Sequence, residues 1–191
     1  MPEKINIADD SSTAGEKLRQ WLSRPLGQSL QSEEQNRISN ILPKLFGYHV
    51  LQIGDFGELD LLESSRISHK IRMLFNPCED TDSGCTLLGD EESLAIASHS
   101  MDVVVLPHVL EFVSNPHKLL REVERILIGE GHLVLTGFNP WSLWGLWRLL
   151  LLWREMPPWN GHFYAYTRIK DWLSLLDLEL IQNERFFFRP P

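Results

Sequence analysis

Cysteine is scarce in this chain, which has only Cys78 and Cys85 among its 191 residues. The two stand seven positions apart in a polar segment, and no second Cys or His pair lies at the spacing of a zinc ligand set. This pattern predicts neither a disulfide framework nor a metal site. A reducing compartment fits such cysteine usage, so we expect a cytoplasmic protein.

Long apolar runs are also missing. The longest covers residues 149–153, far short of the roughly 20 residues of a membrane span. The first residues lack the apolar core of a secretory signal. Basic residues are outnumbered, 18 against 26 acidic ones, and the resulting net charge of -8 argues against nucleic acid as a partner.

The composition that remains is that of one globular unit. With 43% hydrophobic and 23% charged residues, the chain is long enough to bury one substantial core and too short for two. We therefore expect a helical cap over residues 1–45 and an α/β domain over residues 46–191, joined in a single structural unit.

Residues 102–139 predict a complete βαβ unit. An apolar run at 103–106 is typical of a strand buried on both faces of a parallel sheet. Asn115 then offers a helix cap, and Pro116 suits the first helical position. A second apolar run at 133–135 follows the helix. The two strands must run parallel, with a right-handed crossover.

The rest of the chain predicts the other layers of such a fold. We expect two N-terminal helices, one ending near residue 24 and one near Pro43, and a further helix capped by Thr167. The remaining elements follow from apolar periodicity and turn residues. They are strands at 48–53, 70–75 and 86–88, a helix at 58–68, a short connection at 76–86 and an extended run at 178–188.

These motifs together resemble a class I S-adenosylmethionine-dependent methyltransferase. The resemblance rests on a strand followed by Gly54-Asp55-Phe56-Gly57, on Gly89-Asp90 after the third strand, and on DVVVLPHVLEFV. The segments PLGQSL, HVLQIG and GFNPWSLWGLWRLL are similar to bacterial methyltransferase-domain proteins with undefined substrates. This resemblance implies a Rossmann-like, doubly wound, mostly parallel sheet. It also implies S-adenosylmethionine as cofactor and methyl transfer to a small-molecule acceptor.

The resemblance also implies where the cofactor binds. The loop after the first strand would approach the methionine part of the cofactor, and Asn76 would bind the ribose. Asp90 and Glu91 would contact the adenine, and the end of the fourth strand would line the cofactor. Asn76 follows Gly54 by 76 − 54 = 22 positions, close to the ribose spacing of about 20 in dinucleotide folds. The expected cofactor residues are Gly54, Asp55, Phe56, Gly57, Asn76, Asp90, Glu91, Leu106, Pro107 and His108.

Several of these positions depart from the family pattern. Gln52 replaces an acidic residue, and the bulky Phe56 and Glu58 stand where small residues let the cofactor approach. Asn76 bonds a ribose hydroxyl without the charge assistance of a carboxylate. The departures favour an alternative, a catalytically inactive module that binds or scaffolds.

His108 is the candidate catalytic residue. An imidazole at the carboxyl end of a central strand has a pKa near neutrality and could serve as a base toward the acceptor. Methyl transfer mainly requires alignment, so a packing role is the alternative. Asn139 and Trp141, just after the fifth strand, are the expected acceptor contacts; a capped loop that opens a helix is the alternative there.

Five of the seven tryptophans lie between Trp141 and Trp159. In this segment apolar residues occur on all sides of a helix, which favours a wall or lid for an apolar or aromatic acceptor. Contact of residues 143–153 with a membrane surface, or with a partner, stays open as an alternative.

The family fold closes with two further strands, whereas residues 178–188 supply sequence for one. We therefore expect a sheet without its last strand, in a chain truncated at its C-terminus.

Overall fold

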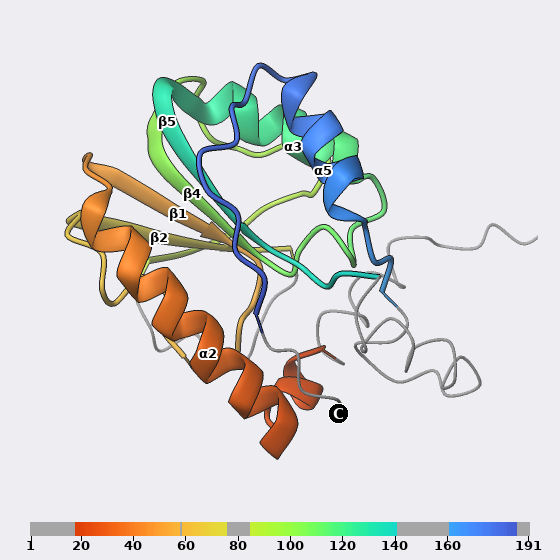
Figure 1. The fold of residues 1–191 in the computed structure, drawn as a ribbon. Coiled ribbons are helices and arrows are strands. Elements are labelled where there is room, and N and C mark those ends of the chain that lie inside the picture. Colours follow the sequence, from red (N-terminus) through yellow and green to blue (C-terminus); the bar gives the residue numbers. More distant parts are fainter. Residues whose placement is uncertain (1–17, 58, 76–84, 141–160, 187–191) are drawn as a thin grey trace, which may run out of the picture.

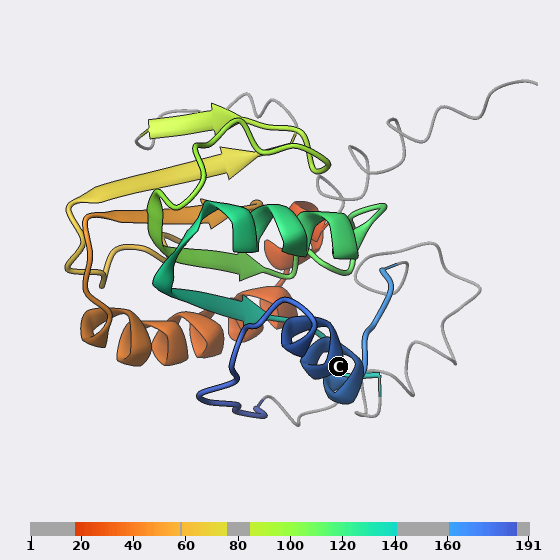
Figure 2. The ribbon, with the colours of Figure 1, turned by 90° about the horizontal axis from the view of Figure 1, so that it is seen from above.

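The computed structural model describes residues 18–57, 59–75, 85–140 and 161–186. Its sheet has the strand order β3-β2-β1-β4-β5, and every neighbouring pair is parallel, so that all arrows in Figure 2 point the same way. The order reverses between β1 and β4, which makes their carboxyl ends the switch point of the fold. The strands are β1 His49–Ile53, β2 His69–Leu74, β3 Cys85–Leu88, β4 Met101–Pro107 and β5 Leu127–Thr136.

The predicted βαβ unit is confirmed as β4, helix α3 (Pro116–Ile126) and β5. The Asn115 side chain caps α3 by accepting the backbone N–H of Lys118 at 3.1 Å, and Pro116 occupies the first turn. The apolar stripe of α3 is fully buried against the sheet through Leu119, Leu120, Val123 and Ile126. Capping, proline placement and periodicity agree here, which is why the sequence predicted this unit well.

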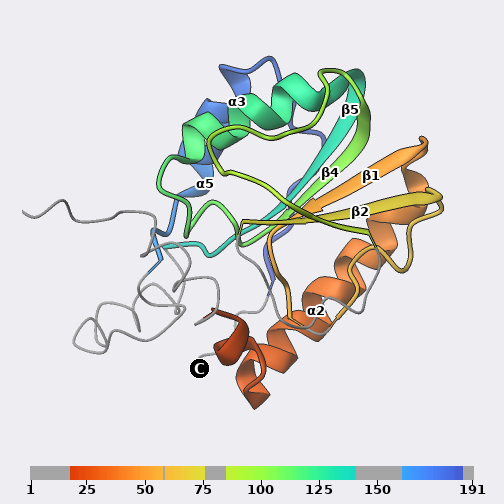
Figure 3. The same cartoon turned by 180° about the vertical axis from the view of Figure 1, so that it is seen from behind.

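The molecule has three layers (Figures 1 and 3). Helices α3 and α5 (Tyr166–Ser174) cover one face of the sheet, and α2 (Pro25–Ile41) covers the other. Alternate residues of β1 face opposite layers: Leu51 and Ile53 join the core that includes α3, while Val50 packs with Ile38 of α2. The second N-terminal helix predicted from sequence is therefore α2, and a shorter helical stretch at residues 18–22 precedes it.

The predicted helix at residues 58–68 is wrong: residues 59–68 contain no helix and include a turn at 61–64. Asp60 Oδ1 accepts the N–H of Leu62 at 2.9 Å, and Ser65 Oγ accepts that of Ile67 at 3.2 Å. Such bonds from short polar side chains compete with a helix ladder. Leu61 and Leu62 are nevertheless buried in the core beneath α2, so no helix is needed to remove them from water.

The C-terminal region also departs from expectation. Helix α5 begins at Tyr166, so Thr167 lies within it and does not cap it. Residues 178–186 join no strand; they run past the β5 edge of the sheet to α2 (Figures 1 and 2). There Arg37 of α2 binds Glu184 at 2.6 Å, and its guanidinium lies 4.7 Å from the ring centroid of Phe186. Within the described ranges the sheet therefore ends at β5.

Replacing Asn115 by Ala should lower the free energy of unfolding by about 1 kcal/mol, because the first turn of α3 loses its side-chain acceptor. Urea denaturation measures this change. Ser114→Ala is the matched control, since the neighbouring Ser114 side chain is exposed and does not cap α3. Equal effects of the two substitutions would contradict a capping role for Asn115.

Candidate functional site

The carboxyl ends of the parallel strands meet at one edge of the sheet, called the carboxyl edge here. The chain after β1 (residues 54–57, the glycine loop), the residues after β3 (Asp90 and Glu91) and the end of β4 (His108) all lie along it. The fold thus brings together predicted site residues from three separate parts of the sequence. Asn76 and Trp141 lie outside the described residues.

The glycine loop is a tight turn with left-handed backbone. Gly54 has φ +96° and Gly57 has φ +78°, conformations that side-chain-bearing residues rarely adopt. The N–H of Gly54 donates to the carbonyl of Met73 at 2.9 Å, and Asp55 Oδ1 accepts the N–H of Gly57 at 2.8 Å. Gly54, Asp55 and Gly57 are partly exposed, so this loop offers backbone to a ligand.

Phe56 occupies a position where the family pattern has a small residue. Its ring is 1% exposed and packs with Ile38, Leu42 and Val50 in the core beneath α2. The bulky side chain is therefore accommodated by the core, and the exposed part of the glycine loop consists of its neighbours.

His108 lies at the centre of a buried charged triad that includes Glu34 from α2 and Glu111. Its Nε2 lies 2.9 Å from Glu34 Oε1, and its Nδ1 forms a longer ion pair with Glu111 Oε1 at 3.5 Å. All three side chains are at most 3% exposed. Burial by itself lowers the pKa of His108, but the charge of Glu34 and the interactions with Glu111 raise it to about 10. His108 is therefore an imidazolium at neutral pH, without the lone pair that a base needs.

Glu111 extends the triad to the chain after β5. Its Oε1 accepts the backbone N–H of Phe138 at 2.7 Å, and its carbonyl accepts that of His162 at 2.8 Å. The Phe138 ring stacks on the His108 ring with centroids 4.2 Å apart, and on the Phe163 ring at 5.1 Å. Glu111 thus fixes the residues that lead into the partly buried Asn139, the predicted acceptor contact.

Sequence reasoning missed both glutamates of the triad. Glu34 lies four residues from both Leu30 and Ile38, on the buried stripe of a predicted helix. A charged residue at such a position requires a buried partner, and this was the available signal. For Glu111 no signal was available, because its partners come from β4 and from beyond β5.

The other predicted cofactor residues lie at the same edge and differ in exposure. Leu106 and Pro107 are buried at the end of β4. Asp90 is exposed, and its Oδ1 accepts the N–H of Glu92 at 2.9 Å. The Glu91 carboxylate receives the N–H of Ser114 at 3.3 Å, which ties the residues after β3 to the chain after β4.

Polar atoms without hydrogen-bond partners concentrate at the carboxyl edge. Among the described residues, five buried side-chain N or O atoms lack a hydrogen bond, and all but Ser64 Oγ lie at this edge. Two of these atoms belong to the side chains of the triad, and those of Gln52 and Thr136 leave unused hydrogen-bonding capacity at this edge. The four atoms are Gln52 Oε1, His108 Nδ1, Glu111 Oε2 and Thr136 Oγ1.

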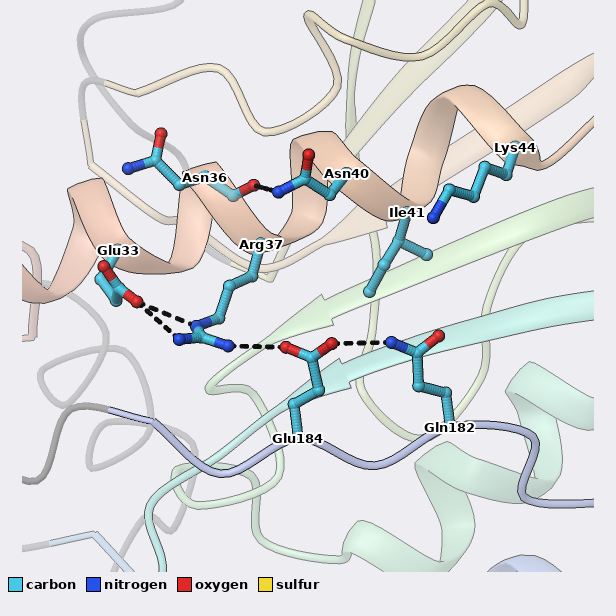
Figure 4. A pocket seen from close by; sticks show the side chains of 8 residues that line it. All are labelled: Glu33, Asn36, Arg37, Asn40, Ile41, Lys44, Gln182 and Glu184. Carbon is cyan, nitrogen blue, oxygen red and sulfur yellow. Dashed lines mark hydrogen bonds and ion pairs between the residues drawn. The ribbon is translucent and has the colours of Figure 1, made fainter.

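A separate hollow of about 350 Å³ lies between α2 and the C-terminal segment (Figure 4). Arg37 crosses it, bound to Glu33 at 2.7 Å and to Glu184 at 2.6 Å. Its guanidinium is thereby neutralised by two carboxylates, so the hollow has no strong preference for an anion. Its lining residues are Glu33, Asn36, Arg37, Asn40, Ile41, Lys44, Gln182 and Glu184.

The segment 143–153, considered above for membrane contact, lies outside the described residues. Of the helices in the described ranges, none has the length and apolar character that crossing a membrane requires.

Two sequence comparisons find relatives of this chain. A family model described as a methyltransferase domain matches residues 68–135. The chain is 32% identical over 170 residues to the uncharacterized protein YafS of Escherichia coli K12, with 89% of this chain and 69% of YafS aligned.

Two solved structures share the fold at low sequence identity. One is an S-adenosylmethionine-dependent methyltransferase of Thermotoga maritima, a possible histamine N-methyltransferase, with TM-score 0.57 and 18% identity, covering 76% of this chain and 71% of that chain. The other is the YcgJ protein of Bacillus subtilis, with TM-score 0.59 and 16% identity, covering 76% of this chain and 68% of that chain.

The triad predicts a pH dependence of stability. Because folding raises the pKa of His108 from 6.5 to about 10, the stabilisation is fully present below about pH 6.5 and is lost as pH rises toward 10. The free energy of unfolding, measured in urea between about pH 6 and pH 10, should fall by on the order of a few kcal/mol.

Glu34→Gln provides the control, since it removes the largest charge that raises the pKa of His108 and should flatten this decline. An NMR titration of the imidazole resonance, assigned by its absence in His108→Gln, reports the pKa of His108 directly. A His108 resonance that titrates near pH 6.5 in the unaltered protein would rule out the charged triad.

Proposed function

Because this chain belongs to one family with YafS and contains a match to a methyltransferase domain, we propose that it is a class I S-adenosylmethionine-dependent methyltransferase that methylates a small, apolar or aromatic acceptor at the carboxyl edge of its sheet. The observation that carries this proposal is the concentration of unsatisfied buried polar atoms at that edge, beside a partly exposed glycine loop. In open parallel sheets, ligands bind at the switch point of the strand order, here between β1 and β4.

The residues at the edge fit the cofactor. Gln52 is 4% exposed, its Nε2 donates to the carbonyl of Gly54 at 3.1 Å, and its Oε1 is an acceptor without a partner in the described residues. A donor such as an ammonium group would satisfy it. Asp90 and Glu91 give the same edge a negative charge, which suits a cationic ligand.

When bound, S-adenosylmethionine supplies an electrophilic methyl group on a sulfonium. The glycine loop would hold its methionine part through exposed backbone, and Asn76 would bind its ribose. Asp90 and Glu91 would hold the adenine on the rim, while Leu106, Pro107 and His108 would form the floor. Phe56 would act indirectly, since its buried ring anchors the glycine loop in the core.

Asn139 and Trp141 would contact the acceptor. Support for an apolar or aromatic acceptor comes from the rings next to Asn139: Phe138 packs in a buried cluster with Trp21 and Phe163. His108 would position the bound molecules rather than deprotonate the acceptor, because an imidazolium with a pKa near 10 holds its proton at neutral pH. The chemistry then depends on alignment and on exclusion of water. A cytoplasmic location remains part of this proposal.

Isothermal titration calorimetry with S-adenosylmethionine and S-adenosylhomocysteine tests the proposal. The unaltered protein should bind both, and Asp90→Ala should weaken binding about tenfold, equivalent to about 1.4 kcal/mol. Asp90→Asn keeps an acceptor for the N–H of Glu92 and separates lost charge from a disturbed turn.

Glu124→Gln, which neutralises an exposed acid on α3, is the control and should bind as the unaltered protein does. No heat with either ligand at millimolar concentration would favour the inactive binding or scaffold module. Unchanged affinity in Asp90→Ala would remove Asp90 from the site.

A further inference from the structure

Helix α2 buries two polar side chains where an amphipathic helix normally buries apolar ones. Gln31 is 5% exposed and Glu34 is 2% exposed, and they share the buried stripe with Leu30 and Ile38. Burying an amide and a carboxylate costs free energy unless both are hydrogen-bonded. The hydrogen-bond partners of Gln31 and Glu34 therefore indicate why polar side chains are buried on this face of α2.

Both partners belong to the candidate cofactor site. The Gln31 amide donates from Nε2 to the carbonyl of Phe56 in the glycine loop. Glu34 accepts a hydrogen bond from His108 at the end of β4, with 2.9 Å between His108 Nε2 and Glu34 Oε1. Residues three apart on one helix thus contact two segments at the carboxyl edge, the glycine loop and the end of β4.

The contact with the glycine loop is sterically specific. A Cβ atom on Gly57 would lie 2.6 Å from Gln31 Nε2, so the absence of a side chain at Gly57 makes room for the Gln31 amide. Arg19, from the helical stretch before α2, adds an ion pair to Asp55 at 3.6 Å. Residues 18–41 therefore contact the glycine loop at the carbonyl of Phe56, at the Phe56 ring and at the Asp55 carboxylate.

We propose that Gln31 and Glu34 are positioning residues for the cofactor, through which α2 sets the shape of the glycine loop and of the end of β4. This inference rests on the proposed function, since it assumes that these segments bind S-adenosylmethionine. In this chain a neighbouring helix restrains a loop in which Phe56 replaces a small residue. Residues 18–41 are then part of the binding site and not merely a cap on the sheet.

The core alone does not explain this pair of residues. Replacing a whole buried ion pair by apolar residues of similar volume is often neutral or stabilising, so packing alone does not require the Glu34–His108 pair. Gln31 instead points its donor at a backbone carbonyl in the glycine loop. A positioning role explains that direction, because a hydrogen bond fixes orientation where apolar contact does not.

Substitution of Gln31 by Leu tests the proposal, because it keeps the size of the side chain and removes the donor. Calorimetric affinity for S-adenosylmethionine and S-adenosylhomocysteine should fall about tenfold or more, equivalent to at least about 1.4 kcal/mol. Measurements are made well below the thermal midpoint of every variant, so that all are folded. Gln28→Leu, an exposed position on the same helix, is the matched control and should keep full affinity.

Amide NMR supplies a readout that a purely structural role would not move. In Gln31→Leu the Gly54 and Gly57 resonances should shift before any ligand is added and should lose their ligand-induced shifts, while resonances of α3 stay in place. Should Gln31→Leu fail to fold, the more flexible Gln31→Met replaces it. Glu34→Gln should weaken both ligands as well, with the changes centred on His108.

The outcomes separate this inference from the proposed function. If the unaltered protein binds neither ligand, the proposed function fails first and this inference fails with it. If the unaltered protein binds and the folded Gln31 variant binds equally well, the positioning role is overturned while the proposed function stands.

Discussion

The arrangement of the site depends on one buried charge interaction, the triad of Glu34, His108 and Glu111. Its members come from α2, from the end of β4 and from the segment before α3, and Glu111 continues to the backbone of Phe138 after β5. Removing one member would leave a buried charge without compensation, which is strongly unfavourable. These elements therefore hold one relative position at the carboxyl edge of the sheet.

The triad also explains how a glycine loop that departs from the family pattern can persist. The Phe56 ring lies parallel to the His108 ring, with the ring centroids 6.4 Å apart. The backbone carbonyl of Phe56 accepts a hydrogen bond from Gln31 Nε2. The side chain that would obstruct a cofactor is directed into the core, and the polar groups of α2 restrain the backbone that remains. A bulky side chain in such a loop excludes a ligand only when it points toward the ligand. The Phe56 ring instead packs in the core beneath α2.

The elements that could be predicted from sequence are those in which local signals agree. Around α3, the Asn115 cap, Pro116 and the apolar stripe all favour the same helix, and the strands β1 and β4 are mostly apolar. Prediction failed at residues 59–68, where apolar spacing favoured a helix but α2 already covered that face of the sheet. Local periodicity does not reveal that another element has taken the surface that a helix would bury.

The sequence by itself determined the parallel sheet, its crossover at β4 and β5, and the place of the glycine loop after β1, because these depend on periodicity and turn chemistry within short stretches. Only the tertiary structure decided the state of His108. In sequence it is an imidazole with an ordinary pKa, and in the fold it is a cation held between carboxylates 74 positions before it and three positions after it. The pKa of a buried group depends on the charges that folding brings beside it, and distance along the chain does not specify those charges.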